Sequence, residues 1–132
     1  RIGYAISNSK LIEKILLVKQ PYNINSAAEH VAIKAMKNKD DLLLKVRILI
    51  EQKDKIYKFL TKYESVTPYP SSANFILCDF LRIDVNDVFE KLAKNGIFVR
   101  KFSDKNIKNS LRISAGTPDQ TRKLLRVLET II

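Results

Sequence analysis

Apolar and polar residues follow two different periods along this chain, and the period changes near residue 66. Before that point, apolar residues recur every three or four positions, which is typical of amphipathic helices. The pattern predicts a strand at 2–7, followed by helices at 10–20, 26–36 and 40–63. The last of these helices is long enough to connect two domains.

After residue 66 the apolar segments become short, and segments with the pattern of strands are interspersed with segments that have the pattern of helices. Pro68 and Pro70 interrupt the helical pattern and favour an extended connector. Beyond them, the pattern predicts strands at 74–80, 97–102 and 111–115, and helices at 85–94 and from 118 onwards.

Capping signals mark the ends of the last two predicted helices. Asp84 is a suitable N-cap for the first of them, and Gly96 lies just beyond its end. Thr117, Pro118 and Gln120 have the spacing of a capping box with proline at the first helical position. Both helices therefore have defined starting points.

This order of elements predicts an α/β fold with a small α+β domain at its C-terminal end, in which helices cover one face of a sheet. We expect residues 1–38 to be the end of a larger domain, 39–65 a connecting helix, and 66–132 the small domain. The chain opens inside an apolar, strand-like segment without a polar lead-in. We therefore expect it to be a fragment of a longer protein.

The chain is strongly basic, with 24 lysines and arginines against 14 acidic residues and a net charge of +10. Such a surplus can indicate a nucleic-acid or acidic membrane partner. Here the lysines are interspersed with acids such as Asp40 and Glu51 along helical segments, which is typical of a solvated face. We expect no nucleic-acid partner and no membrane span. A basic α+β binding module remains the alternative from a different functional class.

Cysteine and histidine usage limits the chemistry further. Cys78 is the only cysteine, so an intrachain disulfide is impossible and a reducing compartment such as the cytoplasm is favoured. His30 is the only histidine and has no cysteine or paired carboxylate at metal-ligand spacing. We therefore predict no metal site.

Two arginines interrupt segments that otherwise have the composition of a core. Arg112 lies within 111–116, and Arg100 ends the segment 97–100. A charge in such surroundings is costly unless an opposite charge meets it, and guanidinium groups pair well with carboxylates and phosphates. The pattern predicts an anion-binding site. The alternatives are an ion pair between Arg112 and Asp79, and an Arg100 side chain that points into water.

Five segments follow one another in a recognisable order: Arg1-Ile2-Gly3-Tyr4-Ala5, Lys19-Gln20-Pro21-Tyr22-Asn23-Ile24-Asn25, Ser72-Ala73-Asn74-Phe75-Ile76-Leu77, Gly96-Ile97-Phe98-Val99-Arg100 and Leu111-Arg112-Ile113-Ser114-Ala115-Gly116-Thr117. Together they resemble the C-terminal part of the histidinol-phosphate aminotransferases, which are fold-type-I enzymes that use pyridoxal phosphate. The resemblance extends from the first residue to the last helix. Five motifs in order are more specific than any one of them.

The resemblance implies a role for each matching residue. Arg1 would bind the phosphate of the cofactor, Arg112 would clamp the α-carboxylate or amino-alcohol end of the substrate, and Arg100 would hold its distal phosphate. The remaining residues with implied roles lie near the substrate pocket or in a loop near the dimer interface and active site: Asn74, Tyr22 and Asn23.

The resemblance also implies that no catalytic residue lies in this chain. The family's Schiff-base lysine belongs to a Ser-x-x-Lys segment that would lie upstream of Arg1, and neither Lys10 nor Lys14 matches that motif. The aspartate that pairs with the pyridine nitrogen would also lie upstream. We therefore expect the isolated chain not to transaminate.

By the same resemblance, the complete enzyme would be a homodimer that transfers an amino group between histidinol phosphate and 2-oxoglutarate in histidine biosynthesis. It would work in the cytoplasm, or in the plastid of a plant. Aromatic amino-acid aminotransferases and threonine-phosphate decarboxylases share the fold and also bind anions, so they remain alternatives.

Overall fold

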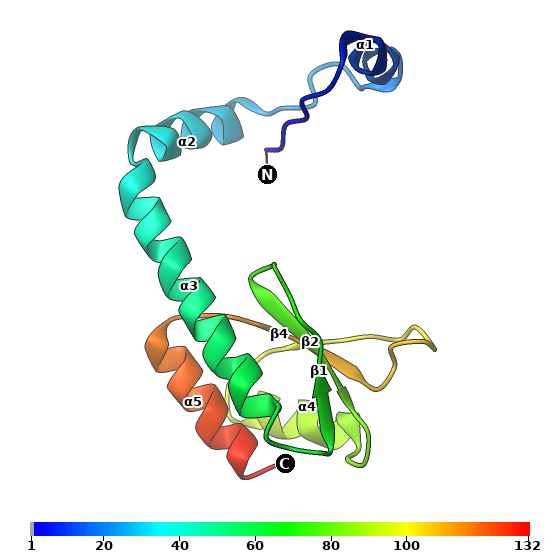
Figure 1. The fold of residues 1–132 in the computed structure, drawn as a ribbon, viewed down its shortest axis with the longest axis vertical. Coiled ribbons are helices and arrows are strands. Elements are labelled where there is room, and N and C mark those ends of the chain that lie inside the picture. The colour runs from blue at the N-terminus through cyan, green and yellow to red at the C-terminus, as the bar shows by residue number, and fades with distance from the viewer. Residues whose placement is uncertain (1) are drawn as a thin grey trace. The chain divides into compact units, whose positions relative to one another are not determined.

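The computed structural model describes residues 2–132 and contains two compact units, with the division between Leu43 and Leu44 (Figure 1). The division falls inside the long helix α3 (Lys39–Leu60). Our sequence-based boundaries at 38/39 and 65/66 stay predictions, since compactness alone does not define the domains of a complete enzyme.

The first unit contains two further helices, α1 (Ser9–Val18) and α2 (Ser26–Lys37). Each begins after an asparagine that acts as N-cap. The Asn8 side chain accepts a hydrogen bond from the Leu11 N–H at 3.0 Å, and the Asn25 side chain accepts one from the Ala28 N–H at 2.8 Å. These caps satisfy backbone donors that the first helical turn leaves free.

This unit has no buried core among residues 2–43, because all of their side chains are exposed or half-buried. Short helices are marginal in water without tertiary packing. On α1 and α2, several large apolar side chains lie exposed: Leu11, Ile15, Leu16, Leu17, Val18, Val31, Ile33 and Met36. The predicted strand at 2–7 is wrong, because residues 2–43 contain no second strand with which it could pair.

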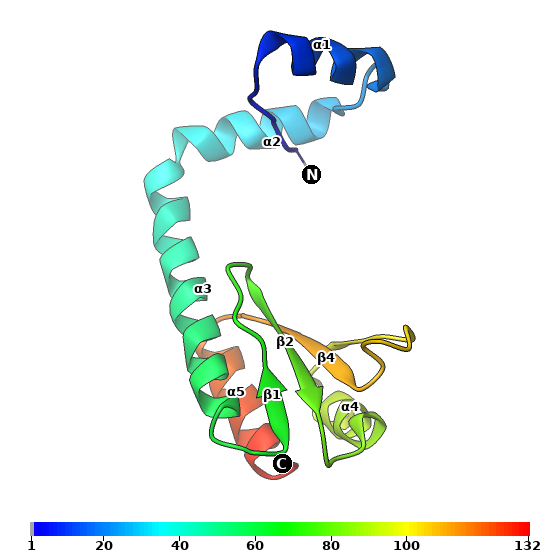
Figure 2. The ribbon, with the colours of Figure 1, turned by 45° about the vertical axis from the view of Figure 1, so that its right-hand side comes forward.

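The second unit is built on a four-stranded antiparallel sheet in the order β1-β2-β4-β3. Figure 2 labels β1, β2 and β4 of this sheet. The strands are β1 (Val66–Pro68), β2 (Phe75–Phe80), β3 (Arg100–Lys101) and β4 (Ser110–Ser114). Strand β2 is central and alternates in burial, with Ile76, Cys78 and Phe80 facing the core. This period of two is expected for a sheet with one covered face.

Three helices supply the other half of this core: the second part of α3, α4 (Val85–Lys94) and α5 (Pro118–Glu129). In both views α5 runs beside the lower half of α3 (Figures 1 and 2). The predicted layer of helices over one sheet face is confirmed. The buried apolar residues of the core between the helices and the sheet are Ile56, Leu60, Val66, Ile76, Cys78, Phe80, Val85, Val88, Leu92, Leu111, Ile113, Leu124 and Leu128.

The predicted capping signals of α4 and α5 are confirmed. Asp84 accepts a hydrogen bond from the Asn86 N–H, and Gly96 has a φ of 70°, a conformation that glycine adopts without strain. At α5, Thr117 and Gln120 form a reciprocal capping box. The chain therefore enters and leaves the sheet at fixed points.

The predicted strand at 97–102 is shorter in the structure, where only Arg100–Lys101 pairs with β4. The Ile97 N–H is bonded to the Leu92 carbonyl of α4 at 2.9 Å. The first residues after Gly96 therefore still complete the end of the helix, and the sheet begins only afterwards.

Cys78 lies at the centre of the core, and its thiol donates a hydrogen bond to the Leu111 carbonyl at 3.5 Å. Burial, assisted by the negative charge of Asp79, raises the pKa of the Cys78 thiol from 9.0 to about 12. Because folding favours the neutral thiol, this contribution to stability is present below pH 9.0 and is lost as pH rises towards about 12.

We predict that Cys78 in the folded chain does not react with iodoacetamide at pH 9, since alkylation requires an accessible thiolate. Labelling in urea, which exposes the thiol, should be complete under the same conditions. Mass spectrometry of samples quenched at matched times measures both rates. Equal rates with and without urea would contradict the burial of this residue.

Candidate functional site

The register of the sheet places the two predicted anion-binding arginines side by side. Arg100 on β3 pairs with Arg112 on β4, and Leu77 on β2 lies opposite Arg112 on its other side. Directly paired residues of neighbouring strands share one face of the sheet, and like charges in such positions repel. This face is the one that α3, α4 and α5 do not cover, since Leu111 and Ile113 of β4 point into the core instead.

Arg112 is half-buried, and its charge has no partner in the described part of the chain. Its Nε atom is buried without a hydrogen-bond acceptor, and no ion pair involves its guanidinium among residues 2–132. The Cζ atom lies 5.0 Å from the centroid of the Phe75 ring, which gives a cation–π contact. That contact orients the guanidinium but does not satisfy its donors.

Asp79, the alternative partner of Arg112, is occupied by neutral groups. One of its carboxylate oxygens accepts a hydrogen bond from the Tyr69 hydroxyl at 2.6 Å, and the other accepts one from the Ser110 hydroxyl. The hydrogen bond to Asp79 and the charge of that carboxylate raise the pKa of the Tyr69 hydroxyl. A structural ion pair therefore does not explain Arg112.

Arg100 lies at the edge of the same face and is exposed. Its Cζ atom is 5.6 Å from the centroid of the Phe102 ring, a second cation–π contact. The side chain therefore packs on an aromatic ring while its donors stay accessible. This accessibility fits both an anion site and the alternative of a solvated side chain.

Both arginines line one cavity of about 510 Å³ that is widely open to solvent, the arginine cavity, and this favours the anion site. Its wall also includes Lys101, which pairs with Leu111 and therefore lies on the side of β3 opposite to Arg100. There the Lys101 ammonium donates a hydrogen bond to Asn86 and lies 5.7 Å from the centroid of the Phe89 ring of α4. The wall contains no carboxylate. The lining residues are Phe89, Phe98, Val99, Arg100, Lys101, Arg112 and Ser114.

Sequence reasoning missed several of these wall residues, and a simple signal could have found two of them. Ser114 lies two positions after Arg112, and Phe98 lies two positions before Arg100. In extended chain, residues two apart share a face. Phe89 could not be found in this way, because it comes from helix α4.

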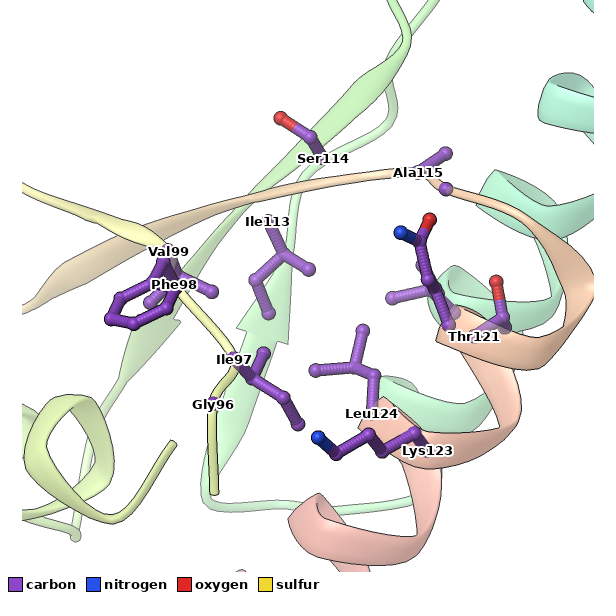
Figure 3. Close-up of a pocket in the computed structure, with 13 residues that line it drawn as sticks. Gly96, Ile97, Phe98, Val99, Ile113, Ser114, Ala115, Thr121, Lys123 and Leu124 are labelled. Atoms are coloured by element: carbon purple, nitrogen blue, oxygen red, sulfur yellow. The ribbon is translucent and has the colours of Figure 1, made fainter. Parts of the chain in front are cut away.

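A second cavity of about 510 Å³ lies between the end of β4, the segment before β3 and helix α5 (Figure 3). Figure 3 shows Ile97 pointing towards the α5 side chains Lys123 and Leu124, whereas the Phe98 ring points away from them. Thr121 in its wall is 3% exposed, and its hydroxyl has no hydrogen-bond partner. Phe98 lines both cavities and so stands at the boundary between them.

The other residues with implied roles lie elsewhere. Asn74 is exposed at the start of β2, and its carbonyl accepts a hydrogen bond from the Ala115 N–H at 2.8 Å. Tyr22 and Asn23 belong to the first unit. Tyr22 is 99% exposed with a φ of 56°, an uncommon conformation for a residue other than glycine, and Asn23 accepts a hydrogen bond from Lys19 at 3.0 Å. Arg1 lies outside the described residues.

Lys101, the lysine in the wall of the arginine cavity, is hydrogen-bonded to Asn86 and is not presented as a free amine. Residues 2–132 contain no group of three or more histidine, cysteine, aspartate or glutamate side chains that could hold a metal, and no helix there is long and apolar enough to cross a membrane. The cavity can bind and orient anionic groups, and we assign it no covalent step.

The comparison with protein families gives this anion site its context. The family model for "Aminotransferase class I and II" matches residues 1–128. The chain belongs to this aminotransferase family.

Among its relatives, the histidinol-phosphate aminotransferase of Caldanaerobacter subterraneus subsp. tengcongensis is 38% identical over 133 residues. The match covers 100% of this chain and 37% of that protein. The chloroplastic histidinol-phosphate aminotransferase of Nicotiana tabacum is 34% identical over 130 residues, covering 98% of this chain and 32% of the relative. The chain thus spans about a third of the length of these relatives.

Solved structures support the same fold. The histidinol-phosphate aminotransferase of Clostridium acetobutylicum matches with a TM-score of 0.75 at 23% identity, over 94% of this chain and 38% of that one. The L-threonine-O-3-phosphate decarboxylase of Porphyromonas gingivalis matches with a TM-score of 0.72 at 18% identity, over 95% and 39%. The chain therefore has the fold of the C-terminal part of a fold-type-I aminotransferase.

We predict that Arg112→Met leaves the free energy of unfolding unchanged or raises it by about 1 kcal/mol, because it removes an unsatisfied buried donor and a like-charge pair. Urea unfolding measures the change. Arg82→Met, at an exposed position outside the cavity, should change stability by no more than about 0.5 kcal/mol and serves as the control. A loss of about 3 kcal/mol or more for Arg112→Met would show that the arginine is a structural ion-pair member.

Proposed function

We propose that this chain is the C-terminal part of a pyridoxal-phosphate-dependent aminotransferase that moves the amino group of histidinol phosphate to 2-oxoglutarate. The observation that carries the proposal is the pair of uncompensated arginines on one sheet face. The names of the relatives, among which histidinol-phosphate aminotransferases recur, support the choice of donor.

In this proposal the two arginines have different tasks because their environments differ. Arg112 is half-buried and fixed on the Phe75 ring, so it suits a group that must be held in one orientation. We assign it the α-carboxylate of 2-oxoglutarate or the amino-alcohol end of the donor. Arg100 is exposed at the rim and can follow a mobile group. We assign it the distal phosphate of the donor.

The remaining assignments follow the family resemblance. Arg1 would bind the cofactor phosphate, and Asn74, Tyr22 and Asn23 would lie near the substrate or the dimer interface. Bound pyridoxal phosphate would supply the electron sink of the reaction, while the protein positions the substrate. The lysine that carries the cofactor would come from a part of the enzyme upstream of these residues.

The same proposal includes the larger organisation of the enzyme. Residues 1–38 would complete the cofactor-binding domain, whose remaining parts would cover the exposed apolar side chains of α1 and α2. Residues 66–132 would form the small domain, with 39–65 as the connecting helix. The complete enzyme would be a homodimer located in the cytoplasm, or in a plastid if the source is a plant.

We predict that a chimera restores activity. It joins the region of the Caldanaerobacter enzyme that precedes the matched segment to residues 1–132 of this chain. The chimera should show the absorbance of bound pyridoxal phosphate and transfer the amino group of histidinol phosphate to 2-oxoglutarate, whereas the 132-residue chain alone should do neither. A folded chimera that never binds the cofactor, or an active isolated chain, would refute the proposal.

Two further chimeras make the test specific to the anion site. Arg112→Ala should raise the KM for histidinol phosphate by about 10- to 100-fold, because hydrogen bonds to charged groups contribute about 1.5–3 kcal/mol. Its affinity for pyridoxal phosphate should stay within about twofold of the parent, a limit well below that effect. Arg82→Ala removes a charge outside the cavity and should change neither value. Equal donor kinetics for Arg112→Ala and the parent would rule out the assigned role.

A further inference from the structure

Phe98 is the aromatic residue of the arginine cavity that has no cation packed on its ring among the described residues. Each of the other aromatic rings at or beside this cavity makes a cation–π contact: Phe75 with Arg112, Phe102 with Arg100, and Phe89 with Lys101. Phe98 is 87% exposed, although it lines the cavity. A large apolar ring at the wall of a charged cavity is available for a ligand.

The orientation of Phe98 separates it from the core. Its neighbours Ile97 and Val99 are half-buried and pack against the core, and Ile97 points towards Leu124. The Phe98 ring points the opposite way, as Figure 3 shows. Within the described residues, the ring therefore makes little contact with the core.

The position of the ring relative to Arg100 limits the ligand it can meet. Residues two apart in an extended chain lie about 7 Å apart on one face. A ligand that reaches Phe98 and Arg100 together therefore needs a flat group and an anionic group joined by a short chain. Flat rings stack favourably on aromatic side chains, in offset or edge-to-face geometry.

We infer that Phe98 is a specificity-determining residue that binds the flat ring of the amino donor while Arg100 holds its phosphate. This inference rests on the proposed function, and it adds the residue that distinguishes a ring-bearing donor from other phosphorylated amines. The carboxylate acceptor 2-oxoglutarate has no ring, so it does not use this contact.

The test uses the 132-residue chain and three probes: histidinol phosphate, the ring-free 2-aminobutyl phosphate, and inorganic phosphate. NMR titration measures each affinity. Phe98→Ala should lower the affinity for histidinol phosphate by about five- to tenfold, which is the effect of one aromatic contact. The affinities for the two ring-free probes should stay within about twofold of the parent values. Phe98→Tyr should restore the affinity for histidinol phosphate. Leu81→Ala removes an exposed apolar side chain outside the cavity and should affect no probe.

The outcomes separate this inference from the proposed function. The inference is overturned, and the anion site stands, if two results are found together. Histidinol phosphate and inorganic phosphate bind with affinities that Arg100→Gln and Arg112→Gln lower, and Phe98→Ala lowers the affinities for all probes equally or for none. If no phosphate-bearing probe shows a response that depends on the arginines, both are overturned. Unchanged unfolding midpoints for Phe98→Ala and Leu81→Ala exclude misfolding as the cause.

Discussion

The repulsion between Arg100 and Arg112 is the constraint on which the functional interpretation depends. The sheet register pairs these residues directly, and neither meets a carboxylate in the described part of the chain. Folding therefore retains an electrostatic cost that an apolar pair at the same positions would avoid. Functional sites commonly keep such costs, because the ligand supplies the missing charge when it binds.

The rest of the second unit holds this pair in place. Leu111 and Ile113 flank Arg112 in sequence and are buried on the opposite face, so the core fixes the side to which the arginine points. A shift of the register by one residue would bury the charge and expose both apolar side chains. The capping box of α5 and the glycine after α4 fix the ends of the segments that lead into and out of the sheet.

Much of this arrangement could be predicted from the sequence, since strong local patterns determine it. The 85–94 helix, the capping residues and the alternation of Phe75–Phe80 follow from side-chain period and cap chemistry. The prediction of a strand at 2–7 was wrong, because a strand also needs a partner strand, and the local sequence pattern does not reveal one. The pairing of Arg100 with Arg112, and the contribution of Phe89 from α4, depend on register and packing and became visible only in the structure.

The most direct test of the central claim is the side-chain Nε–H signal of Arg112 in an NMR titration of the 132-residue chain with inorganic phosphate. The account predicts an Nε–H without a fixed acceptor in phosphate-free buffer, and a saturable shift with slower exchange as phosphate is added. A signal that is already protected without phosphate and does not respond to it would show that a permanent structural partner neutralises Arg112, and would contradict the account.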